Sequence, residues 1–222
     1  MTTARQQTPI AFAQQRLTPK MTVAHGMEIP LEFSSAEIEH KRKASLGICD
    51  VSCFPRFGVK GRNVVQWLKE NKVEIPDPNS WVQQGDSLVL RLGNGEFLVE
   101  DQLEGKLCAA LDGAVMPEAY GVYKIRRNDA ALMLSGSHVR ELFSEICAID
   151  LRDGALLPGK LVMTQMAGIS ATVLRQKFNG EDVFRLWCDG TYSPYLWDTL
   201  LKIAEEFGGG AVGLSCHFKE MP

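Results

Sequence analysis

The stretch "LGICDVSCFPRFGVKG" at residues 46–61 places two thiols, a carboxylate and a hydroxyl close together. The thiols are Cys49 and Cys53, and Asp50 and Ser52 lie between them. A thiol becomes a nucleophile when a nearby base takes its proton, and it binds metal when further ligands stand at recognisable spacing. One histidine lies within fifteen residues of Cys53, and the chain has no C-x-x-C pair. We therefore predict buried free thiols, and we expect Asp50 and Ser52 to bond local backbone amides rather than a ligand.

The composition is that of a globular protein. The chain has 222 residues, 45% of them hydrophobic, and a net charge of −3. This length allows one large domain or two small ones. Because 24 Lys and Arg nearly balance 27 Asp and Glu, neither a nucleic acid nor an anionic membrane is expected as a partner. The apolar runs are shorter than a membrane span, and no secretion signal follows Arg5, so we predict a cytoplasmic protein.

A pattern of strand, glycine and helix occurs twice. The segments are "FGVKGRNVVQWL" at 57–68 and "LMLSGSHVRELF" at 132–143, which align at Gly61 and Gly136. Five apolar positions of the first segment are also apolar in the second. The alternation before each glycine predicts a strand, and the spacing after it predicts a helix. The match is short, but the elements that follow each segment repeat as well.

A hairpin and then a helix are predicted after each of these segments. The hairpins have glycine-containing turns, which suit a reversal between two alternating stretches. Asp101 begins a pattern that resembles a capping box, and Ser193 is expected to be an N-cap before Pro194. A loop is predicted at 72–86, where two prolines and Gly85 occur. The hairpins are predicted at 87–100 and 171–188, and the helices at 101–112 and 193–208.

These elements predict an α+β fold with two pseudo-repeated halves, each strand–helix–hairpin–helix. The halves span about 47–112 and about 122–207 within a domain at 25–207. A crevice between such halves would suit a small ligand. Residues 1–24 are interpreted as a loosely held N-terminal arm and residues 208–222 as a C-terminal tail. Apolar residues of this tail would form an association surface, unless the tail folds back and covers itself.

Several segments resemble a known family. "HGMEIPLEF" (25–33) and "EHKRKASLGICDVS" (39–52), followed by "FGVKG", are similar to the opening of the glycine-cleavage T-protein, or aminomethyltransferase, family. "RQKFNGEDVFRLW" (175–187) resembles that family's Arg-Thr-Gly-Tyr-Thr-Gly-Glu hairpin. Met27 replaces the family's aromatic residue, and Cys53 stands at the position of its usual histidine. The resemblance implies a T-protein-like folate-binding fold without the C-terminal barrel, with tetrahydrofolate as a possible cofactor.

Other segments look more like the gamma subunit of heterotetrameric sarcosine oxidase. They are "LRLGNGEFLVE" and "CAIDLRDGALLPGKLVMTQMAGISATVL". This short relative is regarded as a partner of larger subunits rather than as the catalyst. The resemblance implies a non-catalytic or accessory subunit, with larger oxidase subunits or self-association as partners. The alternative is an aminomethyltransferase-type enzyme that transfers a one-carbon unit to tetrahydrofolate, and a third possibility is a folate-binding maturation factor.

Four residues are candidates for a site, and no metal ligands are predicted. Asp86 aligns with the second of two aspartates in the family pattern. If the protein is an enzyme, the resemblance implies that Asp86 orients or activates the folate amine. Glu181 matches the family hairpin and would accept two N–H groups from a pterin edge. Arg175 begins the same hairpin and is interpreted as a structural or ion-pair residue beside the ligand. Trp81, in the predicted loop, is the aromatic residue most free to meet a ligand or partner.

Overall fold

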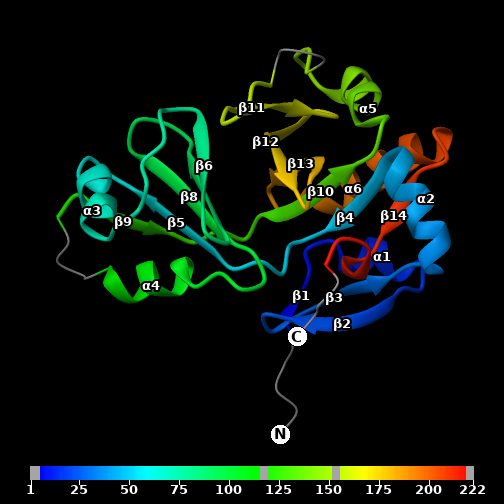
Figure 1. The fold of residues 1–222 in the computed structure, drawn as a ribbon, viewed down its shortest axis with the longest axis horizontal. Coiled ribbons are helices and arrows are strands. Elements are labelled where there is room, and N and C mark those ends of the chain that lie inside the picture. The colour runs from blue at the N-terminus through cyan, green and yellow to red at the C-terminus, as the bar shows by residue number, and fades with distance from the viewer. Residues whose placement is uncertain (1–5, 116–119, 152–155, 219–222) are drawn as a thin grey trace, which may run out of the picture. The chain divides into compact units, whose positions relative to one another are not determined.

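The computed structural model describes residues 6–115, 120–151 and 156–218, which form a mixture of helices and sheets (Figure 1). The predicted α+β class is confirmed. The described residues fall into two compact units. Unit 1 comprises those of Met1–Cys53, Asn128–Pro158 and Val162–Pro222, and unit 2 comprises those of Phe54–Arg127 and Gly159–Leu161.

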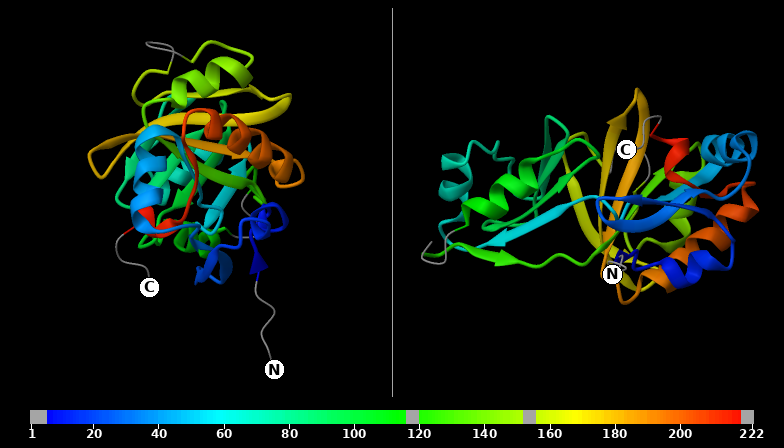
Figure 2. Two further views of the ribbon diagram at one scale, coloured as in Figure 1. Left: turned by 90° about the vertical axis from the view of Figure 1, so that its right-hand side faces the viewer. Right: turned by 90° about the horizontal axis from the view of Figure 1, so that it is seen from below.

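Unit 2 contains an antiparallel five-stranded sheet in the order β6-β7-β8-β5-β9. Two helices, α3 and α4, cover one face of it (Figure 2, right). The core between them and the sheet includes Phe57, Val99, Leu68 and Leu111, all with almost no exposed surface. The elements are Arg56–Lys60 (β5), Val64–Glu70 (α3), Ser80–Gln84 (β6), Ser87–Arg91 (β7), Glu96–Asp101 (β8), Leu107–Ala114 (α4) and Tyr123–Ile125 (β9).

Two predictions for unit 2 are wrong in detail. The loop predicted at 72–86 contains β6, so Trp81 is a strand residue that lies opposite Leu90. The helix predicted from Asp101 begins at Leu107, because Asp101 is still paired within the sheet. Its carboxylate accepts a hydrogen bond from the Ser87 hydroxyl at 2.6 Å and one from the Cys108 amide at 2.9 Å. Asp101 therefore caps the first turn of α4, but it does so from the end of a strand.

Unit 1 is built on a six-stranded sheet in the order β11-β12-β13-β10-β4-β14. Helices α5 and α6 contribute Phe143, Leu196, Trp197 and other buried residues to its core. Phe143 meets Phe184 of β13 edge to face, with ring centroids 5.1 Å apart. The elements are Ala36–Leu46 (α2), Gly47–Asp50 (β4), Ala130–Ser135 (β10), Val139–Ile146 (α5), Leu161–Met166 (β11), Ile169–Phe178 (β12), Glu181–Cys188 (β13), Ser193–Glu206 (α6), Gly210–Val212 (β14) and the 3-10 turn Leu214–Cys216 (η1).

The two glycines of the repeated pattern both have a positive φ angle and both follow a strand. Gly61 follows β5 with a φ of 140°, and Gly136 follows β10 with a φ of 107°. A Cβ atom would lie 2.0 Å from the Gly121 carbonyl oxygen at the first site and 2.3 Å from the Ser45 carbonyl oxygen at the second. Both positions therefore require glycine, because φ is positive and the backbone of another segment passes too close for a side chain.

The N-terminal segment is more ordered than predicted. Gln6–Gln7 (β1), Lys20–Ala24 (β2) and Met27–Glu32 (β3) form a three-stranded sheet in the order β1-β3-β2, and Ala11–Gln15 (α1) packs against α6. Ile10 is fully buried. The prediction of a loosely held arm is therefore wrong for residues 6–24, and residues 1–5 lie outside the described residues.

Asp50 joins this segment to the six-stranded sheet of unit 1. Its buried carboxylate accepts hydrogen bonds from the Thr8 hydroxyl at 2.6 Å, the Gln14 side-chain amide at 2.8 Å and the Ser52 backbone amide at 2.9 Å. The bond to Ser52 confirms the predicted local role. The other two bonds have no sequence signature, because their donors lie 42 and 36 positions away.

The described part of the tail also differs from the expected association surface. β14 pairs in parallel with β4 (Figure 1), and Val212 and Leu214 are fully buried. The alternative, that the tail folds back, is confirmed up to residue 218; residues 219–222 lie outside the described residues. At α6 the N-cap is Tyr192 rather than Ser193, whose hydroxyl donates to the Gly190 carbonyl at 2.8 Å. No helix among the described residues is long and apolar enough to cross a membrane.

Candidate functional site

The hairpin of β12 and β13 carries the residues that resemble the family motif. Its turn is Asn179-Gly180, with φ angles of 50° and 84°, so Glu181 is the first residue of β13 and lies opposite Phe178. The Asn179 side-chain amide donates to the His217 carbonyl at 3.3 Å. The aromatic rings of Phe178 and Phe218 are in contact, with their centroids 5.1 Å apart. The tip of the hairpin is therefore held against the C-terminal segment of the same unit.

Glu181 forms an ion pair with Lys43 of α2. The Lys43 Nζ lies 2.8 Å from Glu181 Oε2, and the two side chains are 19% and 57% exposed. The hydrogen bond from Lys43 lowers the pKa of the Glu181 carboxyl below its usual value. The carboxylate is therefore ionised near neutral pH and is already paired with the Lys43 ammonium group. A ligand that donates N–H groups to Glu181 must share it with Lys43 or displace Lys43.

Arg175 forms the ion pair that we predicted for it. Its guanidinium lies 2.7 Å from a carboxylate oxygen of Asp182, and Lys177 approaches the other oxygen at 3.2 Å. The bond from Arg175 lowers the pKa of Asp182. These contacts join β12 to β13 next to Glu181. The role of Arg175 toward a ligand stays a prediction.

His217 adds a buried neutral imidazole to this region. Burial, followed by the charge of Lys43, lowers the pKa of His217 to about 4. Neither ring nitrogen has a hydrogen-bond partner among the described residues. Burial likewise raises the pKa of the neighbouring Cys216 thiol to about 11. The region thus combines the ionised carboxylate of Glu181 on the hairpin with a neutral imidazole and a protonated thiol on the C-terminal segment.

Sequence reasoning did not identify Lys43 or His217. Lys43 lies in a helix segment rich in charged residues, "EHKRK", and nothing in its spacing distinguishes it from its neighbours. His217 is one of four histidines and lies in the predicted tail. Both reach the hairpin only through tertiary packing, so no short-range signal could have found them.

Asp86 and Trp81 lie on a different hairpin, that of β6 and β7 in unit 2. Asp86 is exposed in the turn, and its backbone carbonyl accepts a bond from the Gln102 amide at 2.7 Å. Trp81 is half-buried, and its indole N–H has no hydrogen-bond partner among the described residues. The structure therefore places two candidates on each of two hairpins, Glu181 with Arg175 and Asp86 with Trp81.

The cysteines match the prediction of free thiols. No disulfide is formed, and Cys49, Cys53, Cys108 and Cys188 are buried. Burial raises the pKa of Cys188 to about 12, which keeps the thiol protonated. Within residues 6–115, 120–151 and 156–218, no group of three or more His, Cys, Asp or Glu side chains is arranged to hold a metal ion.

Comparison with protein families decides the assignment that the hairpin motif suggested. The model of the GCVT N-terminal domain matches residues 80–218, which is more than half of the chain. The chain belongs to the GCVT N-terminal domain family. The match includes both candidate hairpins of this family member, and the predicted relationship to the T-protein superfamily is confirmed.

Curated relatives of this GCVT-domain chain are named aminomethyltransferase. The protein from Thermoanaerobacter pseudethanolicus is 25% identical over 95% of this chain and 61% of its own length. The protein from Anoxybacillus flavithermus is 26% identical over 96% of this chain and 62% of its own length. The chain thus spans about three fifths of the length of these relatives.

Two solved structures share the GCVT-domain fold. The glycine cleavage system aminomethyltransferase T from Bartonella henselae superposes with a TM-score of 0.75 at 17% identity, over 96% of this chain and 61% of that chain. A chain of the heterotetrameric sarcosine oxidase from Corynebacterium sp. U-96 gives a TM-score of 0.65 at 18% identity, over 92% of this chain and 97% of that chain. At these identities the likeness shows the fold, so the predicted T-protein-like fold is confirmed.

Proposed function

We propose that this chain is a non-catalytic or accessory protein of tetrahydrofolate-linked one-carbon metabolism, of the kind of the sarcosine oxidase gamma subunit. The observation that carries the proposal is the ion pair between Lys43 and Glu181. Glu181 is the carboxylate that resembles the pterin-reading residue of the family. A lysine held at 2.8 Å from it competes with the N–H groups of a pterin. The competition lowers the affinity for folate and favours a role without turnover.

A reduced folate is the proposed ligand of this site. A pterin edge presents adjacent N–H donors, and the ionised Glu181 carboxylate can accept two of them once Lys43 has moved. Arg175, fixed by Asp182, keeps the two strands of the hairpin together beside that carboxylate. Trp81, on the β6–β7 hairpin of unit 2, stays a separate prediction of a ligand contact. We also keep larger oxidase subunits or a second copy of the chain as the proposed partners.

The order of strands supports the proposed repeat of two halves. In one sheet β6, β7 and β8 are neighbours and β5 comes next; in the other β11, β12 and β13 are neighbours and β10 comes next. Both β5 and β10 run into a glycine of positive φ and then a helix. The strand beside β5 is β9, and the strand beside β10 is β4. Each of these comes from the other half of the chain.

Calorimetric titration with tetrahydrofolate tests the role of Glu181. We expect Glu181→Gln to weaken binding by about tenfold or more, because a bond to a charged acceptor is lost. Lys43→Met removes the competitor and should strengthen binding. Glu206→Gln, an exposed change of the same charge on α6, is the control and should bind like the native protein. Equal affinities for the native protein and Glu181→Gln, or no binding even by Lys43→Met, would contradict the proposal.

The second candidate function is an aminomethyltransferase-type enzyme, and the names of the curated relatives favour it. In that case Asp86, exposed at its turn, supplies the carboxylate that orients or activates the folate amine. The assay is turnover of an aminomethylated carrier protein with tetrahydrofolate. Multiple turnover that is lost in Asp86→Asn and kept in Asp77→Asn, an exposed loop control, would establish the enzyme and overturn the accessory role.

The accessory role is tested directly by isolating the protein from its native host. Co-purification with a larger flavin-binding oxidase subunit is the expected result. A monodisperse monomer by light scattering, with no co-purifying protein, would count against it. Adjacent genes for such a subunit would favour the first proposal, whereas genes for a lipoyl carrier and a decarboxylase would favour the enzyme.

A further inference from the structure

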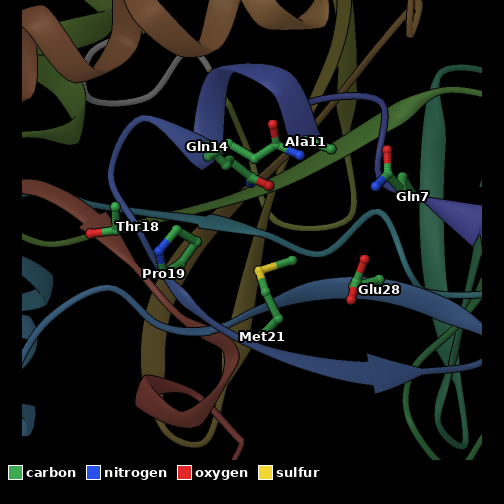
Figure 3. Close-up of a pocket in the computed structure, with 8 residues that line it drawn as sticks. Gln7, Ala11, Gln14, Thr18, Pro19, Met21 and Glu28 are labelled. Atoms are coloured by element: carbon green, nitrogen blue, oxygen red, sulfur yellow. The ribbon is translucent and has the colours of Figure 1, made fainter.

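A cavity of about 200 Å³ lies within the N-terminal part of unit 1. It is formed between α1 and the small sheet of β1, β2 and β3, and it shares no residue with the hairpin that carries Glu181 (Figure 3). Its walls combine amide, hydroxyl and carboxylate groups with apolar side chains. The residues around it are Gln7, Ala11, Gln14, Gln15, Thr18, Pro19, Met21 and Glu28.

The orientation of the Gln14 side chain is fixed by Asp50. The Gln14 side chain donates a hydrogen bond from its Nε2 amide to Asp50 Oδ2 at 2.8 Å. The oxygen of the same carboxamide, Oε1, then faces a different direction from Nε2. Figure 3 shows this side chain reaching from α1 toward the cavity. Oε1 is buried and has no donor among the described residues. A buried acceptor without a donor is costly, which favours a ligand that can supply one.

Glu28 gives the cavity its charge. It lies on β3 between Gln7 of β1 and Val23 of β2, and its side chain is half-buried. Among the described residues, no lysine, arginine or histidine lines the cavity and Glu28 has no salt bridge. The cavity therefore combines an uncompensated carboxylate with an unpartnered amide oxygen. Both groups accept hydrogen bonds, and together they favour a positively charged donor.

The remaining walls are apolar. Ala11 comes from α1, Pro19 precedes β2, and Met21 lies on β2 with part of its flexible side chain exposed. Methionine adapts its shape readily to an apolar group placed against it. A ligand that fits the whole cavity should therefore have a charged head with N–H donors and a short hydrocarbon stem.

We propose that this cavity is a binding site for a small organic cation, a guanidinium or ammonium group on a short apolar stem. The cationic head binds the Glu28 carboxylate and donates to Gln14 Oε1, and the stem packs on Pro19 and Met21. The site is separate from the proposed folate contact at Glu181, so the two proposals can fail independently. Through Gln14, occupation of the cavity also bears on Asp50 and thus on the attachment of the N-terminal segment.

Calorimetry with n-butylguanidinium tests the proposal. We expect it to bind, whereas n-butylurea, a neutral donor of similar shape, and butyrate, an anion with a similar stem, should bind at least about tenfold more weakly. Glu28→Gln should lose about tenfold or more in affinity for n-butylguanidinium. Glu32→Gln is the matched control, because it makes the same charge change on the same strand but lies outside the cavity, paired with Lys20.

Nuclear magnetic resonance of the native protein supplies a readout that needs no variant. Addition of n-butylguanidinium should shift the side-chain amide signals of Gln14, because its oxygen gains a donor, while the Asn179 side-chain signals stay unchanged. The proposal is overturned if n-butylguanidinium fails to shift the Gln14 signals, if n-butylurea or butyrate binds as well as the cation, or if Glu28→Gln and Glu32→Gln bind it equally.

Discussion

Replacement of Asp50 by alanine should detach the N-terminal segment of unit 1. The carboxylate is buried and accepts three hydrogen bonds, from Thr8, Gln14 and Ser52. A net value of about 1 kcal/mol for each bond gives a loss of about 3 kcal/mol in the free energy of unfolding. The loss can exceed this value, because the three donors stay buried without an acceptor in the variant. A small domain has only about 5–15 kcal/mol in total, so the effect is large.

Urea unfolding followed by circular dichroism measures the overall loss, and hydrogen exchange locates it. We expect faster exchange of the amides of residues 8–24, which the Asp50 bonds hold in place. Asp77→Ala, a change of the same type at an exposed loop position, should alter stability by less than about 0.5 kcal/mol. In a double-mutant cycle, Asp50→Ala and Thr8→Val should couple by about 1 kcal/mol because the two residues share a bond. A loss below about 1 kcal/mol, or exchange unchanged in residues 8–24, would refute the reasoning.

Three further predictions follow from single residues. His217 takes up a proton near pH 4 when folded and near pH 6.5 when unfolded, so the unfolded state binds more protons between these values. Lowering the pH through this window should reduce the free energy of unfolding by up to about 3 kcal/mol, and urea titrations should show that His217→Gln lacks this part of the pH dependence. In urea unfolding, Gly136→Ala should reduce the free energy of unfolding several times more than Gly180→Ala does. Both glycines have a positive φ, but only at Gly136 would the new Cβ meet backbone, 2.3 Å from the Ser45 carbonyl oxygen. Burial raises the pKa of the Cys216 thiol to about 11, so near neutral pH it should react with iodoacetamide only after unfolding. Mass spectrometry of labelled peptides measures this, and labelling of Cys216 in the folded protein would contradict the prediction.

Local patterns predicted the parts of the fold in which neighbours in sequence determine the structure. The turn at Asn179-Gly180, with two positive φ angles, and the close-approach glycines Gly61 and Gly136 each have a chemical requirement that only a few residues meet. The predicted strand and helix around each glycine are present for the same reason. The start of α4 was misplaced because Asp101 has the residue type of a cap, whereas the sheet decides which group it caps.

Contacts between distant segments account for what the sequence did not predict. Residues 6–24 contain no long apolar run, and two of their side chains bond to Asp50, which no pattern within the segment reveals. The tail is buried because Val212 adds a parallel strand beside β4, more than 160 positions away in the chain. Parallel pairing of such separated strands leaves no turn signal, so a flexible run of glycines followed by apolar residues reads equally well as an exposed tail.

The same limit applies to the candidate site. A hairpin motif fixes where the backbone places Glu181, because the turn and the strand register are local properties. It does not fix whether the carboxylate is available, since that depends on Lys43, which comes from a helix outside the motif. Here the hairpin carries its glutamate, while a lysine of α2 lies 2.8 Å from one oxygen of that carboxylate. A comparison of Lys43→Met with Glu181→Gln in the tetrahydrofolate titration separates the contribution of the lysine from that of the glutamate.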